Sequence, residues 1–242
     1  MEKDHWDDYL IEGTNVLKNN LNITDSDKLK EIEKDITRTT IAALYLKPIC
    51  KNFDIEDLKK IHKFVFGKIY PFAGEIRLCT LGKDRTSFCD PKNIIKSLDE
   101  ILSDLNKIKN ISSIPELAFY IAPFYHDLIM VHPFREGNGR TIRIFIREFV
   151  LEKSKSLPCG PLDIDYTKMD SKNLLIGTVE RYIYPSMLEV EFMKVLFQNK
   201  KKIVIKSDYF LFAFLFSPYN VNNCKYKSTP RLLIVNRLYN VE

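Results

Sequence analysis

The sequence lacks the features that mark secreted disulfide-bonded, zinc-binding or membrane-spanning proteins. Its five cysteines are scattered and contain no Cys-x-x-Cys pair, so we expect neither a disulfide framework nor a zinc site. A run of roughly 18 uninterrupted apolar residues, the length of a membrane helix, is absent. Residues 1–9 are polar and rich in acids, which does not fit a secretory signal peptide. We therefore expect a cytoplasmic protein without a membrane contact.

Most of the chain also lacks an excess of positive or negative charge. The net charge of +5 comes from residues 199–242, which carry eight Lys or Arg against two Asp or Glu, whereas residues 1–198 carry 29 against 30. The charge balance therefore gives no reason to expect direct binding of nucleic acid. The 242-residue chain is 45% hydrophobic and 12% aromatic. It therefore has enough apolar side chains for a packed core.

Apolar residues at three- and four-residue steps predict a mainly α fold. One helix should begin after Asp25 and end near Pro48, burying an apolar stripe of Leu29, Ile32, Ile36, Thr40 and Ala43. A second should begin after Asp54, with the buried face Leu58, Ile61, Phe64 and Val65 and with His62 as a partly buried surface histidine. Further helices are expected over residues 91–109, 114–131, 139–151, 170–182 and 185–197.

Two segments differ from this helical pattern. Residues 75–81 and 85–89 are β-compatible and flank the turn signal of residues 82–84, which predicts a small β-hairpin. Residues 199–242 form a basic, aromatic-rich tail that contains the run Tyr209–Phe216. The composition of that run leaves a buried strand, a short buried helix and an oligomer contact open, so a homo-oligomer also stays open.

The stretch that carries the chemistry lies between two of the predicted helices and reads His132-Pro133-Phe134-Arg135-Glu136-Gly137-Asn138-Gly139-Arg140-Thr141-Ile142-Arg143. A helix ends near its histidine and another opens near Gly139. The start of a helix leaves backbone N–H groups unpaired at the positive end of the helix dipole. Two glycines allow the backbone to approach a ligand closely. The pattern therefore predicts an anion site suited to phosphate.

The polar side chains of this stretch have separable chemistry. Arg140 and Arg143 lie three apart on the first turn of the helix and can present planar guanidinium groups to phosphate oxygens. Glu136 offers a hard oxygen ligand for Mg²⁺, and the Asn138 amide can orient a phosphoryl oxygen. His132 has the ordinary chemistry of a general base near neutral pH.

This stretch resembles the Fic family pattern His-x-Phe-x-(Asp/Glu)-Gly-Asn-Gly-Arg-x-x-Arg at every fixed position. Phe-Ala-Gly-x-Ile-Arg at residues 72–77 is similar to the entry of the family's flap, and residues 13–19 resemble its opening segment, which packs beside the nucleotide base. The resemblance implies a Fic-type helical bundle over residues 1–198, with a β-hairpin flap at about residues 74–89, and leaves the tail at 199–242 outside the domain.

The resemblance also implies an activity, namely transfer of AMP from ATP–Mg²⁺ to a Tyr, Thr or Ser hydroxyl of a target protein, with release of pyrophosphate. His132, Asn138, Arg140 and Arg143 would be the catalytic residues and Gly137, Asn138, Gly139, Arg140 and Arg143 the nucleotide-binding ones. Glu136 would ligate Mg²⁺, and Phe134 would anchor the loop in the core. The target would dock by strand pairing on flap residues Gly82, Lys83, Asp84 and Arg85.

Several alternatives stay open within this resemblance. The motif reads phosphates and not the base, so transfer of UMP or GMP is open; removal of AMP and an inactive nucleotide-binding module are rivals. The family's phosphorylating branch has Lys where this chain has Gly139, which favours nucleotidyl transfer. The family's inhibitory (Ser/Thr)-x-x-x-Glu-(Gly/Asn) helix, whose glutamate pairs with the second motif arginine, has no complete match. A bacterial toxin whose antitoxin supplies that glutamate in trans is one expectation.

Overall fold

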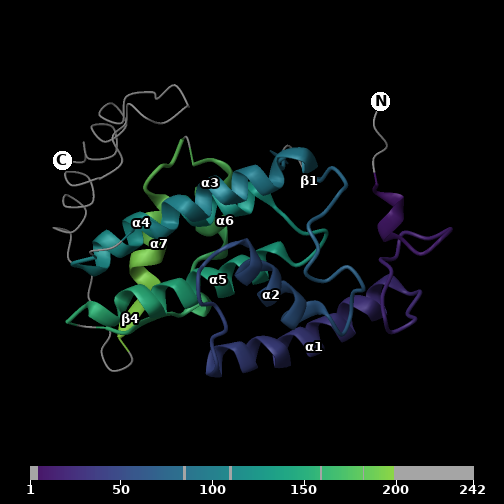
Figure 1. Ribbon diagram of the computed structural model, residues 1–242, viewed down its shortest axis with the longest axis horizontal. Coiled ribbons are helices and arrows are strands. Elements are labelled where there is room, and N and C mark those ends of the chain that lie inside the picture. Colours follow the sequence, from purple (N-terminus) through teal and green to yellow (C-terminus); the bar gives the residue numbers. More distant parts are fainter. Residues whose placement is uncertain (1–4, 84–85, 109–110, 159, 182, 199–242) are drawn as a thin grey trace. The chain divides into compact units, whose positions relative to one another are not determined.

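The computed structural model describes residues 5–83, 86–108, 111–158, 160–181 and 183–198. They form a mainly helical unit with two small antiparallel sheets (Figure 1). Our predictions for the tail, including the run Tyr209–Phe216, lie outside these residues. The helices are α1 (Ser26–Leu46), α2 (Ile55–Phe66), α3 (Ile94–Asn106), α4 (Ile114–Val131), α5 (Asn138–Lys153), α6 (Ser171–Val179) and α7 (Met187–Val195); the strands are β1 (Gly82–Lys83), β2 (Thr86–Ser87), β3 (Leu162–Ile164) and β4 (Leu196–Gln198).

The first two helices begin where the sequence supplies a capping side chain. Asp25 accepts hydrogen bonds from the N–H groups of Asp27 and Lys28 at the start of α1. Asp54 accepts one from Asp57 at the start of α2. Each carboxylate satisfies donors that the helix itself leaves unpaired and lies at the favourable end of the helix dipole. The predicted starts of both helices are thereby confirmed.

The buried face of α1 differs from the predicted stripe by about one residue. The buried side chains are Leu29, Glu33, Thr37 and Leu44, whereas Ala43 is exposed. Two polar residues therefore occupy the inward face, because Glu33 and Thr37 face Arg140 of α5. In α2, similarly, Phe64 is 46% exposed and His62 and Phe66 are fully buried.

Helix α5 is the central element of the core. It packs against α2, α4 and β3 and is drawn between α2 and α4 in Figure 1. Phe145 and Phe149 are fully buried, and each meets the ring of Phe53 edge-on, with ring centroids 5.8 and 5.3 Å apart. Such edge-to-face pairs are favourable beyond their area burial. The first turn of α5, which opens the functional motif, is thereby fixed on a rigid support.

The loop between α1 and α2 is held by two buried carboxylates. Glu148 of α5 accepts the N–H groups of Ile49 and Cys50 at 2.8 and 2.7 Å. Asp57 of α2 accepts the N–H groups of residues 51, 52 and 53 through one oxygen, at 2.7 to 2.9 Å. Burial alone would raise the pKa of Asp57, but these N–H groups and the Lys60 ammonium together hold that pKa below its usual range.

The sheets correct two of our expectations. Strands β1 and β2 pair Gly82 with Ser87 and Lys83 with Thr86, so the predicted hairpin exists but is short, and residues 75–81 form no strand. Strands β3 and β4 pair antiparallel, Leu162 with Gln198 and Ile164 with Leu196. We had assigned residues 196 and 197 to a helix, because a three-residue apolar run gives no period by which strand and helix differ.

Among the described residues, no helix is both long and apolar enough to span a membrane.

Replacing Asp57 with Asn should lower the free energy of unfolding by about 1–3 kcal/mol, because the amide keeps one acceptor oxygen but brings N–H donors to a site lined by buried N–H groups. Chemical denaturation measures this difference. The control Asp99→Asn changes an exposed carboxylate of α3 and should alter stability by less than about 0.5 kcal/mol. Equal stability of Asp57→Asn and the wild type would contradict the role given to this carboxylate.

Candidate active site

Two residues in left-handed backbone conformations bound the motif loop. His132 follows the last residue of α4 with φ 49°, and Gly137 precedes α5 with φ 78°. A Cβ atom on Gly137 would lie 2.3 Å from the ring of Phe66. Both the backbone angle and the packing therefore require glycine at this position. These two residues mark the ends of the loop that joins α4 to α5.

The side chain of Asn138 closes this loop from inside. Its Oδ1 accepts the N–H of Phe134 at 2.8 Å, and its Nδ2 donates to the Phe134 carbonyl at 2.7 Å. The side chain is only 2% exposed. Both ends of the amide are thus used within the protein, so our expectation that it orients a phosphoryl oxygen is not supported. Asn138 instead shapes the loop, and its backbone N–H opens α5.

His62 and Phe134 anchor the loop in the core. Both are fully buried, and their rings stack with centroids 3.9 Å apart, which confirms the anchoring expected of Phe134. The N–H of Gly74 donates to His62 Nδ1 at 2.7 Å, so Nε2 carries the proton and donates to the Glu136 carbonyl at 2.9 Å. Burial lowers the pKa of His62 to about 4. The expectation of a partly buried surface histidine was wrong: His62 is a neutral bridge between three segments.

The imidazole of His132 is oriented on two sides. Its Nδ1 lies 3.1 Å from the Ile129 carbonyl, and a carbonyl can only accept, so the proton is on Nδ1 and the lone pair on Nε2. The ring of Phe88 stacks on the imidazole with centroids 3.8 Å apart and planes 12° apart. This is the tautomer that a general base needs, because Nε2 can accept a proton while Nδ1 stays bonded.

The N-terminus of α5 offers the predicted anion site. No side chain caps it, so the N–H groups of its first turn are directed at whatever occupies the space in front of the helix. A Cβ atom on Gly139 would come no closer to any neighbouring atom than 3.4 Å, to the guanidinium of Arg143. Gly139 therefore lies within contact distance of its cationic neighbour Arg143, one turn further on in the helix.

The two motif arginines have different surroundings. Arg140 Nη2 lies 2.6 Å from Glu33 and 3.5 Å from Glu136, and Nη1 donates to the Thr37 hydroxyl at 3.4 Å. Glu33 also accepts a hydrogen bond from the Tyr70 hydroxyl. Arg140 is thus held against α1, a restraint that we had not predicted.

Arg143 makes no ion pair with any residue that the structure describes. Its guanidinium lies beside the hydroxyl of Tyr125, whose pKa is raised by burial. Its backbone carbonyl accepts the hydroxyl of Tyr166 at 3.0 Å. Of the two arginines, Arg143 is the one that no described carboxylate neutralises.

Glu136 fits a metal that arrives with phosphates rather than a preformed metal cage. Its side chain is 43% exposed, and Oε1 accepts the N–H of Gly137 at 2.9 Å. Within the described ranges, no group of three or more His, Cys, Asp or Glu residues is arranged to hold a metal. Mg²⁺ commonly binds one or two carboxylates together with substrate phosphates and water, and the single carboxylate beside an anion site matches that mode.

The flap, residues 74–89, joins the site through its two legs. The N–H of Arg77 donates to the Pro133 carbonyl at 2.9 Å, and that of Cys89 donates to the Met130 carbonyl at 3.1 Å. Gly82 and Lys83 lie in β1. Asp84 and Arg85, the other two residues expected to dock a target, lie outside the described part of the chain.

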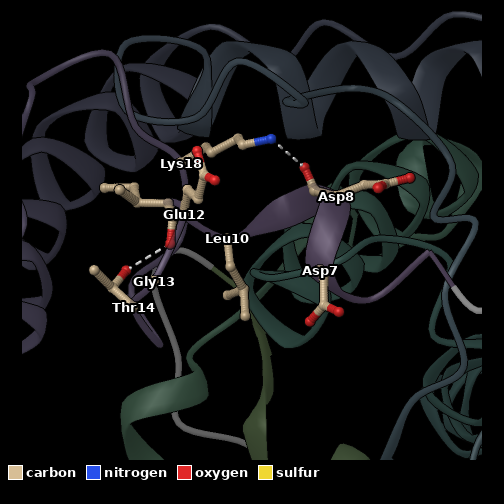
Figure 2. Close-up of a pocket in the computed structure, with 8 residues that line it drawn as sticks. Asp7, Asp8, Leu10, Glu12, Gly13, Thr14 and Lys18 are labelled. Carbon is tan, nitrogen blue, oxygen red and sulfur yellow. Dashed lines mark hydrogen bonds between the residues drawn. The ribbon is translucent and has the colours of Figure 1, made fainter.

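The N-terminal segment, residues 5–18, lies beside the motif loop. The Arg135 guanidinium is 4.1 Å from the ring centroid of Trp6, and the Tyr9 hydroxyl accepts the N–H of Leu78 at 3.0 Å. A hollow of about 430 Å³ lies in this segment, and Figure 2 shows Asp7, Asp8 and Glu12 among the residues that line it. Carboxylates repel a polyphosphate, and no motif residue lines the hollow, although Lys18 does. The hollow therefore does not match the anion site that the sequence predicts at the start of α5.

Glu33, His62, Arg77 and Phe88 contribute to this site but were not assigned to it from the sequence. A signal existed for two of them. His62 interrupts an apolar face at helical spacing, and Glu33 lies four residues after the buried Leu29. A polar residue on an inward face usually has a buried partner, although spacing along one helix does not name that partner.

Comparisons with known proteins identify relatives of this chain. Residues 52–150 match the model of the Fic/DOC family. The chain is 30% identical over 178 residues to the protein adenylyltransferase VbhT of Bartonella schoenbuchensis. The matched region covers 73% of this chain but only 36% of VbhT. It is 26% identical over 153 residues to a probable protein adenylyltransferase Fic of Escherichia coli, covering 62% of this chain and 76% of that protein.

Solved structures share the fold. BepC from Bartonella tribocorum, determined with bound AMPPNP, superimposes with a TM-score of 0.69 at 24% identity and covers 80% of this chain and 98% of that one. A Fic domain from Bartonella quintana with bound ADP gives 0.70 at 22% identity, covering 82% and 98%. The mainly helical architecture predicted from the sequence is thereby confirmed.

Removing His62 should change how stability depends on pH. The pKa of His62 is about 4 in the folded chain and about 6.5 when unfolded. The unfolded state therefore binds the proton first, so stability from this group is complete above about pH 6.5 and is lost toward pH 4, by about 3 kcal/mol. Between pH 7 and pH 4, denaturation without added Mg²⁺ should show a smaller loss for His62→Gln than for the wild type. Equal losses would contradict a neutral, buried His62.

Proposed function

Because this chain belongs to the Fic/DOC family, we propose that it transfers AMP from ATP–Mg²⁺ to a hydroxyl side chain of a target protein. The observation that carries the proposal is the placing of His132, whose Nε2 lone pair lies on a loop that ends at an uncapped helix N-terminus. One short loop thus carries both the base for the target hydroxyl and the helix start proposed to bind the phosphates of ATP.

The phosphates of ATP bind in front of α5 in this proposal. The backbone N–H groups of Asn138 and Gly139 face the anion, since a helix N-terminus favours negative charge. The Gly137 N–H donates to Glu136 Oε1 in the structure and joins them when that carboxylate turns to Mg²⁺. Arg143 is the main cationic ligand, because no described carboxylate competes for it. Arg140 adds charge from the side while Glu33 holds it. Glu136 holds Mg²⁺, which would neutralise phosphate charge and ease departure of pyrophosphate.

His132 then acts on the acceptor. Its Nε2 removes the proton from a Tyr, Thr or Ser hydroxyl as the oxygen attacks the α-phosphorus. The new bond joins that oxygen to phosphorus, and the bond between the α-phosphorus and the oxygen that bridges to the β-phosphorus breaks, so pyrophosphate leaves with that electron pair. The imidazolium returns its proton to solvent. Its Nδ1–H bond to Ile129 keeps the ring in place throughout, as positional catalysis requires.

Glycine at position 139 supports nucleotidyl transfer rather than phosphorylation, because the phosphorylating branch of the family has Lys there. Target docking is assigned to the flap, where the edge of a two-residue strand pair offers backbone groups to an extended peptide. The lack of a described acidic partner for Arg143 supports control by a glutamate supplied in trans, as expected of a toxin with an antitoxin. The target, a cytoplasmic location and a homo-oligomer stay predictions.

His132→Ala should lower the rate of AMP transfer by about 10²–10⁴-fold, because the general base is removed while the phosphate site is kept. Labelling with ATP that carries an α-phosphate label, using the chain itself and a lysate as acceptors, measures the rate. His5→Ala, at a partly exposed histidine near the N-terminus and outside residues 13–19, is the control and should label like the wild type. Wild-type labelling by His132→Ala would refute the role of the base.

Arg143→Ala should weaken binding of ATP–Mg²⁺ by about 10- to 100-fold, because a hydrogen bond to a charged group contributes about 1.5–3 kcal/mol. Isothermal titration calorimetry with a non-hydrolysable ATP analogue measures the affinity. Arg38→Ala removes an exposed arginine of α1 and should leave the affinity unchanged. An unchanged affinity in Arg143→Ala would show that the phosphates do not lie in front of α5.

A further inference from the structure

Arg77 is a fully buried arginine whose guanidinium, among the residues that the structure describes, donates only to backbone carbonyls. Nε donates to His132 at 2.7 Å, Nη1 to Cys79 at 2.5 Å, and Nη2 to Cys89 at 2.6 Å and Val131 at 3.3 Å. No carboxylate among the described residues forms an ion pair with it. Burying a charge without a counter-ion costs free energy. The four carbonyls directed at the planar guanidinium offset that cost by hydrogen bonding.

Two of these carbonyls belong to the C-terminal end of α4. Val131 is the last residue of the helix and His132 follows it in the left-handed conformation. The last carbonyls of a helix lack internal partners and lie at the negative end of the dipole. A guanidinium there satisfies two of them and complements the dipole. Arg77 therefore stabilises the left-handed backbone conformation of His132 in which the chain leaves α4.

The other two carbonyls belong to the two legs of the flap, Cys79 on the way in and Cys89 on the way out. Phe88, directly before Cys89, stacks on the imidazole of His132. The guanidinium thus fixes the backbone of His132 and also the leg that carries the ring packed on its imidazole. Arg77 therefore holds the backbone of His132 directly, and it holds the imidazole through Phe88, whose neighbour Cys89 it also binds.

We propose that Arg77 is a positioning residue, which joins the flap to His132 so that the base and the strand that receives the acceptor keep one mutual geometry. The inference rests on the proposed function for its catalytic meaning, but the geometry it claims can be measured without turnover. Lysine cannot replace this group, because one ammonium cannot reach carbonyls on three segments as a planar fork does.

The imidazole tautomer provides the first test. The chain has only four histidines, so ¹⁵N spectra of a histidine-labelled protein can be assigned by comparison with His132→Ala. In the wild type above neutral pH, His132 should be protonated on Nδ1 and His62 on Nε2. In Arg77→Lys, the His132 signals should move toward a mixture of tautomers, while His62 keeps its own. An unchanged His132 tautomer in a folded Arg77→Lys protein would overturn the proposal.

A matched control separates positioning from general destabilisation. Arg147 is also buried, 4% exposed, and pairs with Asp163 at 2.6 Å, away from the motif loop. Arg147→Lys should lower the melting temperature as Arg77→Lys does, yet leave the His132 tautomer unchanged. A tautomer change in both variants would make the effect one of stability and would refute the proposal. If Arg77→Lys does not fold, Arg77→Gln, which removes the buried charge and keeps amide donors, takes its place with the same expectations.

The kinetic test uses labelling by α-labelled ATP. Arg77→Lys should lower kcat by about 10- to 100-fold, because small misplacements of a catalytic group have effects of that size, while KM for ATP stays within about twofold of the wild type. An unchanged kcat, or a loss confined to the KM for ATP, would overturn the proposal. If the wild type transfers no AMP, the proposed function fails instead, and the tautomer measurement still decides the role of Arg77.

Discussion

The hydrogen bond from His62 Nε2–H to the Glu136 carbonyl is the constraint on which the site depends. It fastens the motif loop to α2, while the other ring nitrogen fastens the Gly74 turn to the same helix. Together with the Asn138 amide, which satisfies both backbone groups of Phe134, it leaves the loop few unpaired groups of its own. The amides at the start of α5 can then remain directed outward without loss of order in the loop that precedes them.

The charges around this loop are divided between structure and ligand. Arg77 is hydrogen-bonded by backbone carbonyls and Arg140 forms an ion pair with Glu33, so both guanidinium groups already have partners within the protein. Arg143 has no described counter-ion, and the α5 dipole adds positive potential beside it. A triphosphate would therefore find one uncommitted arginine, one restrained arginine and a helix N-terminus.

Sequence patterns predicted the parts of the fold that depend on neighbours in the chain. The Asp caps of α1 and α2 act within three residues, and the contiguous motif identified the loop, its glycines and its histidine. The sequence did not predict partners that folding alone brings together, such as Glu33 with Arg140, or His62 with Glu136. It also misplaced the inward face of α1 by one residue, because a pattern of apolar residues cannot show that a glutamate faces the core when its partner is an arginine on another helix.

The claim that an uncapped helix start grips a triphosphate can be tested directly, because the chain has only eight glycines. In a ¹⁵N-glycine spectrum titrated with Mg²⁺ and a non-hydrolysable ATP analogue, the amide signals of Gly137 and Gly139 should shift together, while those of Gly160 and Gly177 stay in place. Saturable binding of the analogue with Gly137 and Gly139 unmoved would place the phosphates elsewhere and contradict the account.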